Sequence, residues 1–324
     1  MARLLDTIDQ PQRLKDLTPA QLRQLAAELR DEIVTTTAQT GGHLGANLGA
    51  IEITLALHSA LNSPEDKLIW DVGHQAYAHK LLTGRREAFK TLRQYGGLSG
   101  FPKRSESVHD AFGTAHAGTS VSAALGYALA RDGRRESHHV VCVTGDGAMT
   151  AGMVFEALNH AGQLGTRLVV ILNDNEMSIS KNVGALSEYL TRVRIDPTVQ
   201  RARGELEHLA QRLPGGSQVL KAVGRIKDLV EQVLVPGQLF TELGFTYYGP
   251  IDGHDIELLQ RTLRQSLAKR GPVLIHAITE KGRGYQPAES DPGKLHAVKA
   301  AKAEGPAKAR RVKAPTYSQV FGDA

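Results

Sequence analysis

The chain has 324 residues, of which 41% are hydrophobic and 23% charged, so it can bury a full core, and this composition argues against intrinsic disorder. Its single cysteine, Cys142, excludes an internal disulfide and a cysteine metal cluster and favours a reducing, cytoplasmic location. The net charge of +5 comes from a basic stretch between Lys294 and Lys313 that lacks aromatic residues, and we interpret it as a solvated linker rather than a nucleic-acid-binding arm.

The sequence contains no candidate membrane segment. No apolar run reaches the ~18–20 residues that a spanning helix needs. The first residues, Met1 to Asp6, carry no apolar segment of a secretory signal. We therefore expect a protein without membrane partners and without nucleic-acid partners.

The first predicted helix begins after Thr18. The Thr18 side chain can cap the helix, Pro19 suits the first turn, and Gln21 can complete a capping box. Leucines at helical spacing extend this helix to about Val34, where a glycine-rich segment follows.

Strands and helices then alternate along the chain. The predicted elements are helices over 48–61, 119–130, 151–161 and 256–268, and strands over 67–72, 139–144, 168–173, 245–248 and 273–279. This alternation predicts an α/β fold with a parallel sheet flanked by helices. The charged, helix-prone stretch from Arg192 to Leu234 interrupts the pattern, and we expect it to be a mobile insert in a domain that spans residues 1–290.

Polar loops follow four of the predicted strands. They contain Asp71 to His74, Asp146, the triplet from Asn173 to Asn175, and the segment after Ile278. Because ligands of parallel sheets bind beyond the carboxyl ends of the strands, we expect these loops to gather on one edge.

Asp146 and Asn175 are the strongest candidates for a metal site. Mg²⁺ binds oxygen ligands and usually shares them with substrate phosphates. Asp146 supplies a carboxylate, Asn175 a carboxamide oxygen, and the backbone carbonyl of Met177 can complete the set. Gly145 and Gly147 allow the backbone to approach a diphosphate closely. An Asp-Gly pair after a strand is often only a turn, but a second polar triplet at the next strand end favours a site.

Four histidines lie in loops that could carry chemistry. His43 and His74 lie in glycine-rich settings, whereas His116 and His296 precede or follow predicted elements. A neutral imidazole can donate or accept a proton near physiological pH. Lys281, after the last predicted strand, suits a phosphate contact. The remaining candidates fit helix or strand patterns and are interpreted as structural: His58, His138 and His160.

Several segments together resemble the 1-deoxy-D-xylulose-5-phosphate synthase family of thiamine diphosphate enzymes. These segments are Gly41–Leu44, Asp71–Tyr77, His79–Arg85, Gly97–Phe101, Gly145–Gly147, Asn173–Ser180 and Gly249–Asp255. The resemblance implies a thiamine diphosphate-binding fold, in which this chain is the diphosphate-binding domain. It also implies a transketolase-type transferase that condenses pyruvate with glyceraldehyde 3-phosphate, releases CO₂ and feeds isoprenoid and thiamine synthesis.

The resemblance assigns roles to individual residues. Asp146, Asn175 and the Met177 carbonyl are implied to hold Mg²⁺, and His43, His74 and His296 to be catalytic. The implied contacts to thiamine diphosphate are His74, Ala115, His116, Ala117, Gly145, Gly147, Ala148, Asn175, Lys281 and Tyr285.

The chain departs from the family pattern in sequence and in length. Ala115-His116-Ala117-Gly118 stands where the family often has Gly-His-Ser-Ser, and Asn47 stands where many members have serine. Family members are about twice as long, so residues 291–316 are expected to be a linker and residues 317–324 the start of a pyrimidine-binding domain. We therefore expect a homodimer or a complex with a pyrimidine-binding subunit. The alternatives are a non-catalytic remnant or regulatory module that binds thiamine diphosphate and Mg²⁺, or a subunit of another split transketolase-like enzyme.

Overall fold

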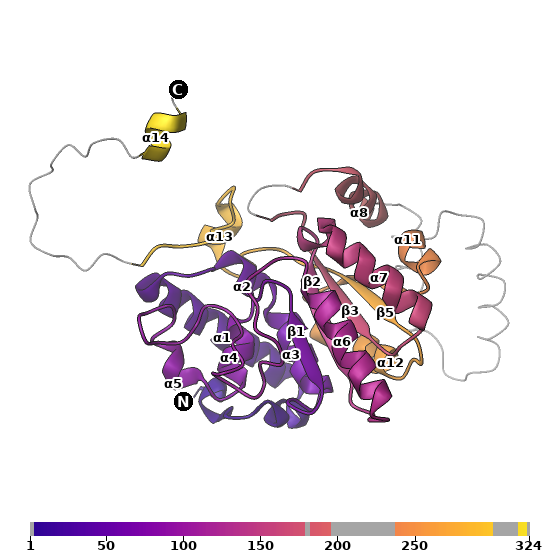
Figure 1. Cartoon of the computed structure of the whole chain (residues 1–324). Helices are drawn as coiled ribbons and strands as arrows, with labels where there is room; N and C mark the ends of the chain where they lie inside the picture. Colours follow the sequence, from indigo (N-terminus) through magenta and orange to yellow (C-terminus); the bar gives the residue numbers. More distant parts are fainter. Residues whose placement is uncertain (1–2, 179–181, 196–236, 301–316, 323–324) are drawn as a thin grey trace, which may run out of the picture.

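The central element of the molecule is a parallel β-sheet. The computed structural model describes residues 3–178, 182–195, 237–300 and 317–322 (Figure 1). Within these residues the sheet has five strands in the order β1-β2-β3-β5-β4, and every neighbouring pair is parallel. The strands are β1 (Lys67–Trp70), β2 (Val140–Gly145), β3 (Val169–Asp174), β4 (Thr246–Asp252) and β5 (Val273–Ile278). The predicted α/β fold is confirmed.

Helices cover both faces of the sheet, as Figure 1 shows. Helices α6 (Ser120–Gly133) and α7 (Gly152–Leu164) pack with β2 and β3 in one apolar cluster. Helices α3 (Ile51–Ala60) and α12 (Ile256–Leu267) pack on the opposite face in a second cluster. Because both faces are covered, the central strands are continuous apolar runs rather than alternating ones.

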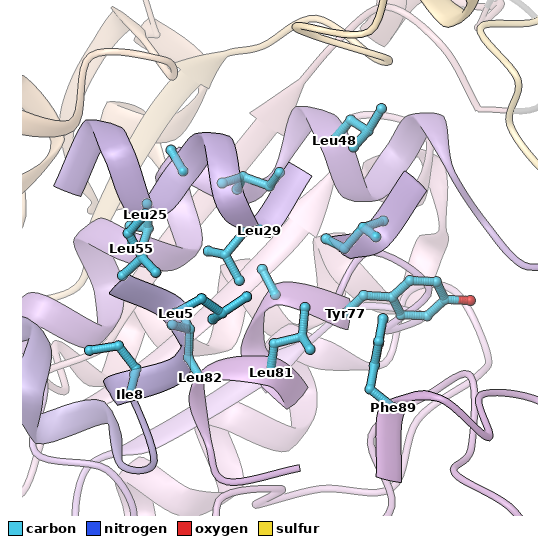
Figure 2. Close-up of a cluster of buried hydrophobic side chains, with 14 of the residues drawn as sticks. Leu5, Ile8, Leu25, Leu29, Leu48, Leu55, Tyr77, Leu81, Leu82 and Phe89 are labelled. Atoms are coloured by element: carbon cyan, nitrogen blue, oxygen red, sulfur yellow. The ribbon is translucent and has the colours of Figure 1, made fainter. Parts of the chain in front are cut away.

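A third layer lies outside α3. Helix α1 (Pro19–Thr40) packs there with α4 (Tyr77–Leu82) and α5 (Arg86–Phe89). Figure 2 shows the shared cluster, to which Leu5, Leu29, Leu55, Tyr77 and Phe89 belong. Two 3₁₀ helices complete this layer, η1 (Leu4–Thr7) and η2 (Pro11–Asp16). The layer supports the backbone of the segments around residues 43 and 74.

Three differences from the predicted elements stand out. Strand β4 continues to Asp252, beyond the expected end at Tyr248. Helix α1 continues to Thr40, beyond the expected end near Val34. The expected helix over 48–61 is divided at Ala50 into α2 (Gly45–Gly49) and α3. A Cβ atom on Gly49 would lie 2.8 Å from the carbonyl oxygen of Glu280, so a distant loop packs closely at this break.

The remaining helices are short or lie near the candidate site. They are η3 (Ala148–Thr150), α8 (Ala185–Ile195), α11 (Gln238–Glu242), α13 (Gln286–Ser290) and α14 (Tyr317–Gly322). The predicted mobile insert over 192–234 falls outside the described residues except for the end of α8. Of the predicted linker, residues 291–300 are described, and Val298 forms an antiparallel bridge with Gly42. In the described ranges, no helix has the length and apolar character needed to cross a membrane.

The capping box of α1 provides a test of the fold. Thr18 Oγ1 accepts a hydrogen bond from the Gln21 N–H, and Gln21 Oε1 accepts one from the Thr18 N–H. Thr18→Ala is expected to lower the free energy of unfolding by about 1 kcal/mol, because one N-terminal N–H loses its partner. Urea unfolding measures this change, and Thr18→Ser, which keeps the hydroxyl, is the control that should retain wild-type stability.

Candidate functional site

Two buried carboxyl groups lie side by side at the carboxyl ends of β2 and β3. Pairing of Gly145 with Asn173 places Asp146 next to Asp174, and the two residues are only 4% and 2% exposed. Burial and the negative charge of Asp174 raise the pKa of Asp146 to about 7. Ionisation of Asp146 at the end of this strand pair is therefore electrostatically unfavourable.

Asp174 is the member of this pair that stays ionised. Although burial opposes ionisation, the hydrogen bond from His276 and the charge of Arg194 lower the pKa of Asp174. The distance from His276 Nε2 to Asp174 Oδ2 is 2.8 Å, and Tyr247 Oη lies 2.8 Å from the other ring nitrogen. The protein therefore stabilises the ionised form of Asp174. The ionised form of Asp146 would gain stability from a nearby cation.

The structure places the other predicted metal ligands at the same edge. Asn175 follows Asp174 directly, and its side-chain oxygen accepts a hydrogen bond from the Met177 N–H at 3.3 Å. The Met177 carbonyl in turn accepts a hydrogen bond from Lys281 Nζ at 2.7 Å. Lys281 is only 4% exposed; burial lowers its pKa to about 8, although the charge of Asp146 opposes this shift. Lys281 thus links the end of β5 to the loop after β3.

The chemistry of these donors fits Mg²⁺ bound together with a diphosphate. One carboxylate, one carboxamide oxygen and one backbone carbonyl are few ligands, and Mg²⁺ completes its octahedron with phosphate oxygens and water. Asp146 now accepts a hydrogen bond from Asn182 Nδ2 at 2.8 Å, so the site has polar neighbours around that carboxylate. The raised pKa of Asp146 is the property expected of a carboxyl that needs a cation nearby.

The segment after Asp146 is packed tightly against the loop that follows β3. A Cβ atom on Gly147 would lie 3.0 Å from that of Ser178, so a larger residue would displace this loop. Ala148 opens the 3₁₀ turn η3, and α7 begins only at Gly152. The helix that we predicted over 151–161 therefore begins within one residue of its expected start.

The three predicted catalytic histidines form a triangle. The ring centroids of His43, His74 and His296 lie 5.3–5.5 Å apart. Burial lowers the pKa of His43 to about 4 and that of His74 to about 3, and repulsion among the three rings adds to both shifts. Burial and the nearby Lys281 ammonium also lower the pKa of His296. The three imidazoles are therefore neutral at physiological pH.

Among the residues that the structure describes, one ring nitrogen of each of these three histidines lacks a hydrogen-bond partner. In the described part of the chain, the Nδ1 atoms of His43, His74 and His296 are buried and have no hydrogen-bond partner. Buried polar atoms are normally paired, so this set of orphaned nitrogens is unusual. A polar ligand in this triangle would meet three neutral nitrogens that can each accept or donate one proton.

Asn47 fixes two of these histidines through their backbones. Its side-chain amide donates to the carbonyls of His43 and His74, at 2.6 and 2.7 Å. Its oxygen accepts a hydrogen bond from the Tyr77 N–H at 2.8 Å. The sequence identified Asn47 only as a departure from the family pattern, whereas the structure makes it a buried connector between α2 and the loop after β1.

Asp71 fixes the loop that leads into α6. Its carboxylate oxygens accept hydrogen bonds from the N–H groups of Gly118 and Ser120, at 2.8 and 3.0 Å. The three preceding residues, Ala115, His116 and Ala117, are exposed. Ala115 has a φ of +147°, a conformation that favours glycine, which agrees with the glycine that the family often has there. Tyr285 packs against the outer apolar cluster beside α13.

Sequence reasoning missed His276, Asn47 and Asp71 as site-building residues. His276 is the one histidine within the apolar run from Val273 to Ile278, and a polar residue inside a buried strand usually has a specific partner. That signal was available in the sequence. The connecting role of Asn47 had no such signal, because its partners at His74 and Tyr77 are distant in the chain.

The chain is similar to known proteins over most of its length. A family model described as 1-deoxy-D-xylulose-5-phosphate synthase matches residues 5–279. The chain belongs to the 1-deoxy-D-xylulose-5-phosphate synthase family. It is 54% identical to the synthase of Pelotomaculum thermopropionicum over 322 residues, which cover 99% of this chain and 50% of that protein. It is 55% identical to the synthase of Desulforudis audaxviator, in an alignment that covers 98% of this chain and 50% of that protein. The chain spans about half the length of the curated synthases it matches.

Solved structures of the same fold are transketolases. The Campylobacter jejuni transketolase superposes with a TM-score of 0.64 at 21% identity, covering 88% of this chain and 41% of that one. The Leishmania mexicana transketolase has a TM-score of 0.61 at 20% identity, with 86% and 39% coverage. This likeness establishes the transketolase-like fold of the synthase family member described here.

The raised pKa of Asp146 has a consequence for stability. Its folded-state pKa of about 7 exceeds the ordinary value of 3.8, so its stabilising contribution is present below about pH 4 and lost as the pH rises through 7. In metal-free buffer at pH 8, Asp146→Asn is expected to raise the free energy of unfolding by roughly 2 kcal/mol, since it removes this charge. Urea unfolding with EDTA at pH 5 and pH 8 measures the effect.

The difference between Asp146→Asn and wild type should shrink at pH 5. The exposed Asp16→Asn is the control, and its effect should be small at both pH values. An equal gain for Asp146→Asn at both pH values would show that the Asp146 carboxyl is not electrostatically strained.

Proposed function

We propose that this chain is the diphosphate-binding half of a 1-deoxy-D-xylulose-5-phosphate synthase, which condenses pyruvate with glyceraldehyde 3-phosphate and releases CO₂. The observation that carries the proposal is the buried Asp146 beside Asp174, with Asn175 and the Met177 carbonyl on the adjoining loop. Membership of the synthase family supports it. The proposed cofactors are thiamine diphosphate and Mg²⁺.

Each predicted ligand has a place in this proposal. Asp146, Asn175 and the Met177 carbonyl would hold Mg²⁺, and the close backbone at Gly147 would admit the diphosphate. The cofactor, when bound, supplies the carbanion chemistry of the reaction, and the protein supplies position and charge. Asp146 would gain its charge as Mg²⁺ binds, so metal binding below pH 7 would release a proton.

The histidine triangle would handle protons and hold the reacting groups. His43, His74 and His296 are neutral and partly buried, so each can take up or return a proton at its free Nδ1. A developing negative charge on oxygen would raise the pKa of an adjacent imidazole and draw a proton to it. Asn47 would keep His43 and His74 at a fixed separation during these steps.

The other predicted contacts complete the cofactor site in our proposal. Gly145, Ala148 and Lys281 would line the diphosphate end, and the exposed loop of Ala115, His116 and Ala117 would meet the cofactor from the α6 side. Tyr285 would contribute from the loop after β5. We place the contacts to the aminopyrimidine in a second domain, of which α14 is the proposed start.

The proposed working form is a homodimer or a complex with a pyrimidine-binding subunit. The relatives are about twice as long as this chain, which supports a second half as partner. We further propose a cytoplasmic enzyme without membrane or nucleic-acid partners, whose product serves isoprenoid and thiamine synthesis.

Binding and turnover can be tested separately. Titration calorimetry of this chain should show thiamine diphosphate binding that depends on Mg²⁺, and Asp146→Ala should weaken it by more than ~100-fold, because the only charged ligand is lost. The exposed His160→Ala in α7 is the matched control and should bind normally. Unchanged binding by Asp146→Ala would defeat the metal assignment.

Turnover should require a second half. CO₂ release from pyruvate and glyceraldehyde 3-phosphate is measured with this chain alone and with the C-terminal half of the Pelotomaculum thermopropionicum synthase added. Activity only upon addition supports the proposal. Cofactor binding without CO₂ release in any combination would instead support a non-catalytic binding module.

A further inference from the structure

The loop that carries Lys281 is held at both ends by partly buried side chains outside the candidate site. This loop runs from Glu280 to Arg283, one residue after β5. The segment that contains His254, which follows β4, has no role in the function proposed above. In the structure, His254 lies between this loop and helix α3.

The two partners of His254 select one tautomer of its ring. Its Nε2 lies 2.9 Å from the backbone nitrogen of Glu280, and its Nδ1 lies 3.0 Å from Glu52 Oε2. A backbone N–H can only donate, so Nε2 accepts, and the ring proton must sit on Nδ1 and point to the Glu52 carboxylate. His254 therefore connects α3 to the first residue of the loop through two directional hydrogen bonds.

Glu52 and Arg30 hold the other end of the loop. Glu52 is 6% exposed and forms a 2.6 Å ion pair with the Arg30 guanidinium. The Nε of Arg30 donates to the carbonyl of Arg283 at 2.7 Å. A buried ion pair is unfavourable unless its remaining donors and acceptors are satisfied, and here His254 and the Arg283 carbonyl satisfy them.

The contacts at Glu280 and Arg283 lie on either side of Lys281 in the chain. Its ammonium donates to the carbonyls of Met177 and Ser178, on the segment that supplies a predicted metal ligand. The next residue, Gly282, has a φ of +80° and donates its N–H to the Gly45 carbonyl at 2.9 Å. The loop therefore has little freedom, and the direction of the Lys281 side chain is set by how Glu280 and Arg283 are held.

We propose that Arg30, Glu52 and His254 form a clamp that positions Lys281 against the metal-binding segment. These three are positioning residues, because they act through the loop and do not touch the cofactor site. The proposal rests on the proposed function for its effect on ligand binding, but the position of Lys281 can be tested without any ligand. A break in the clamp should free the Lys281 amine and weaken Mg²⁺-dependent cofactor binding together.

The first measurement follows the Lys281 amine in the ligand-free chain. Reductive methylation with formaldehyde and a borane reagent, followed by peptide mass spectrometry, gives the labelling rate of Lys281 relative to the exposed Lys90. His254→Phe keeps the ring but loses both hydrogen bonds, and it should raise this ratio several-fold. Arg23→Ala, which removes an exposed ion pair between α1 and α12, is the matched control and should leave the ratio unchanged.

The second measurement is calorimetric titration with thiamine diphosphate and Mg²⁺. His254→Phe should weaken binding about 10-fold, and Glu52→Gln, which keeps the size of the side chain, should show a smaller loss in the same direction. If His254→Phe does not fold, Glu52→Gln replaces it as the test variant. A glutamine at this position can still accept a hydrogen bond from His254 Nδ1, but it cannot form the ion pair with Arg30.

The outcomes separate the two proposals. If wild type binds no thiamine diphosphate, the proposed function fails, and the labelling ratio alone decides the clamp. If wild type binds and His254→Phe changes neither the ratio nor the affinity, the clamp is overturned. A parallel rise in the labelling of Lys281 and of the fully buried Lys80 in α4 would mean general unfolding. It would also overturn a specific positioning role, provided Glu52→Gln behaves in the same way.

Discussion

The repulsion between two buried carboxyl groups is the constraint on which the candidate site depends. Parallel pairing of β2 and β3 brings Asp146 next to Asp174 in apolar surroundings. The two groups are not stabilised alike, because the His276 hydrogen bond and the Arg194 charge lower the pKa of Asp174. Asp146 keeps a pKa near 7 and is the group that gains most from a divalent cation. The fold thus leaves a destabilised carboxyl group at the position where we propose that a cation binds.

The rest of the molecule brings cationic and neutral groups to the same edge. Lys281 arrives from the end of β5 and contacts the loop after β3. His43, His74 and His296 arrive from the third layer, from the end of β1 and from the segment after α13. Their burial keeps them neutral, since each protonated ring would face both low polarity and the Lys281 ammonium or another ring. Charge at the edge is therefore concentrated at Asp146, Asp174 and Lys281.

Much of the fold was predictable from local patterns. The apolar runs predicted all five strands of the described sheet, and Thr18 with Gln21 predicted the start of α1, because capping involves neighbours in the chain. The position of Asp146 and Asn175 at one edge of the sheet was predictable, because parallel strands place their carboxyl ends together. The break at Ala50 was not predictable, because it depends on the distant loop at Glu280 that packs against Gly49.

The sequence by itself determined the order of strands and helices, the polar residues at the strand ends and the family to which they point. Only the tertiary structure decided that three histidines meet, that Asn47 joins two of them and that His254 carries its proton on Nδ1. Hydrophobic periodicity and helix capping involve residues that are close in the chain, so the sequence alone reveals them. Protonation states and hydrogen-bond partners depend on burial and on distances between residues far apart in the chain, which exist only after packing.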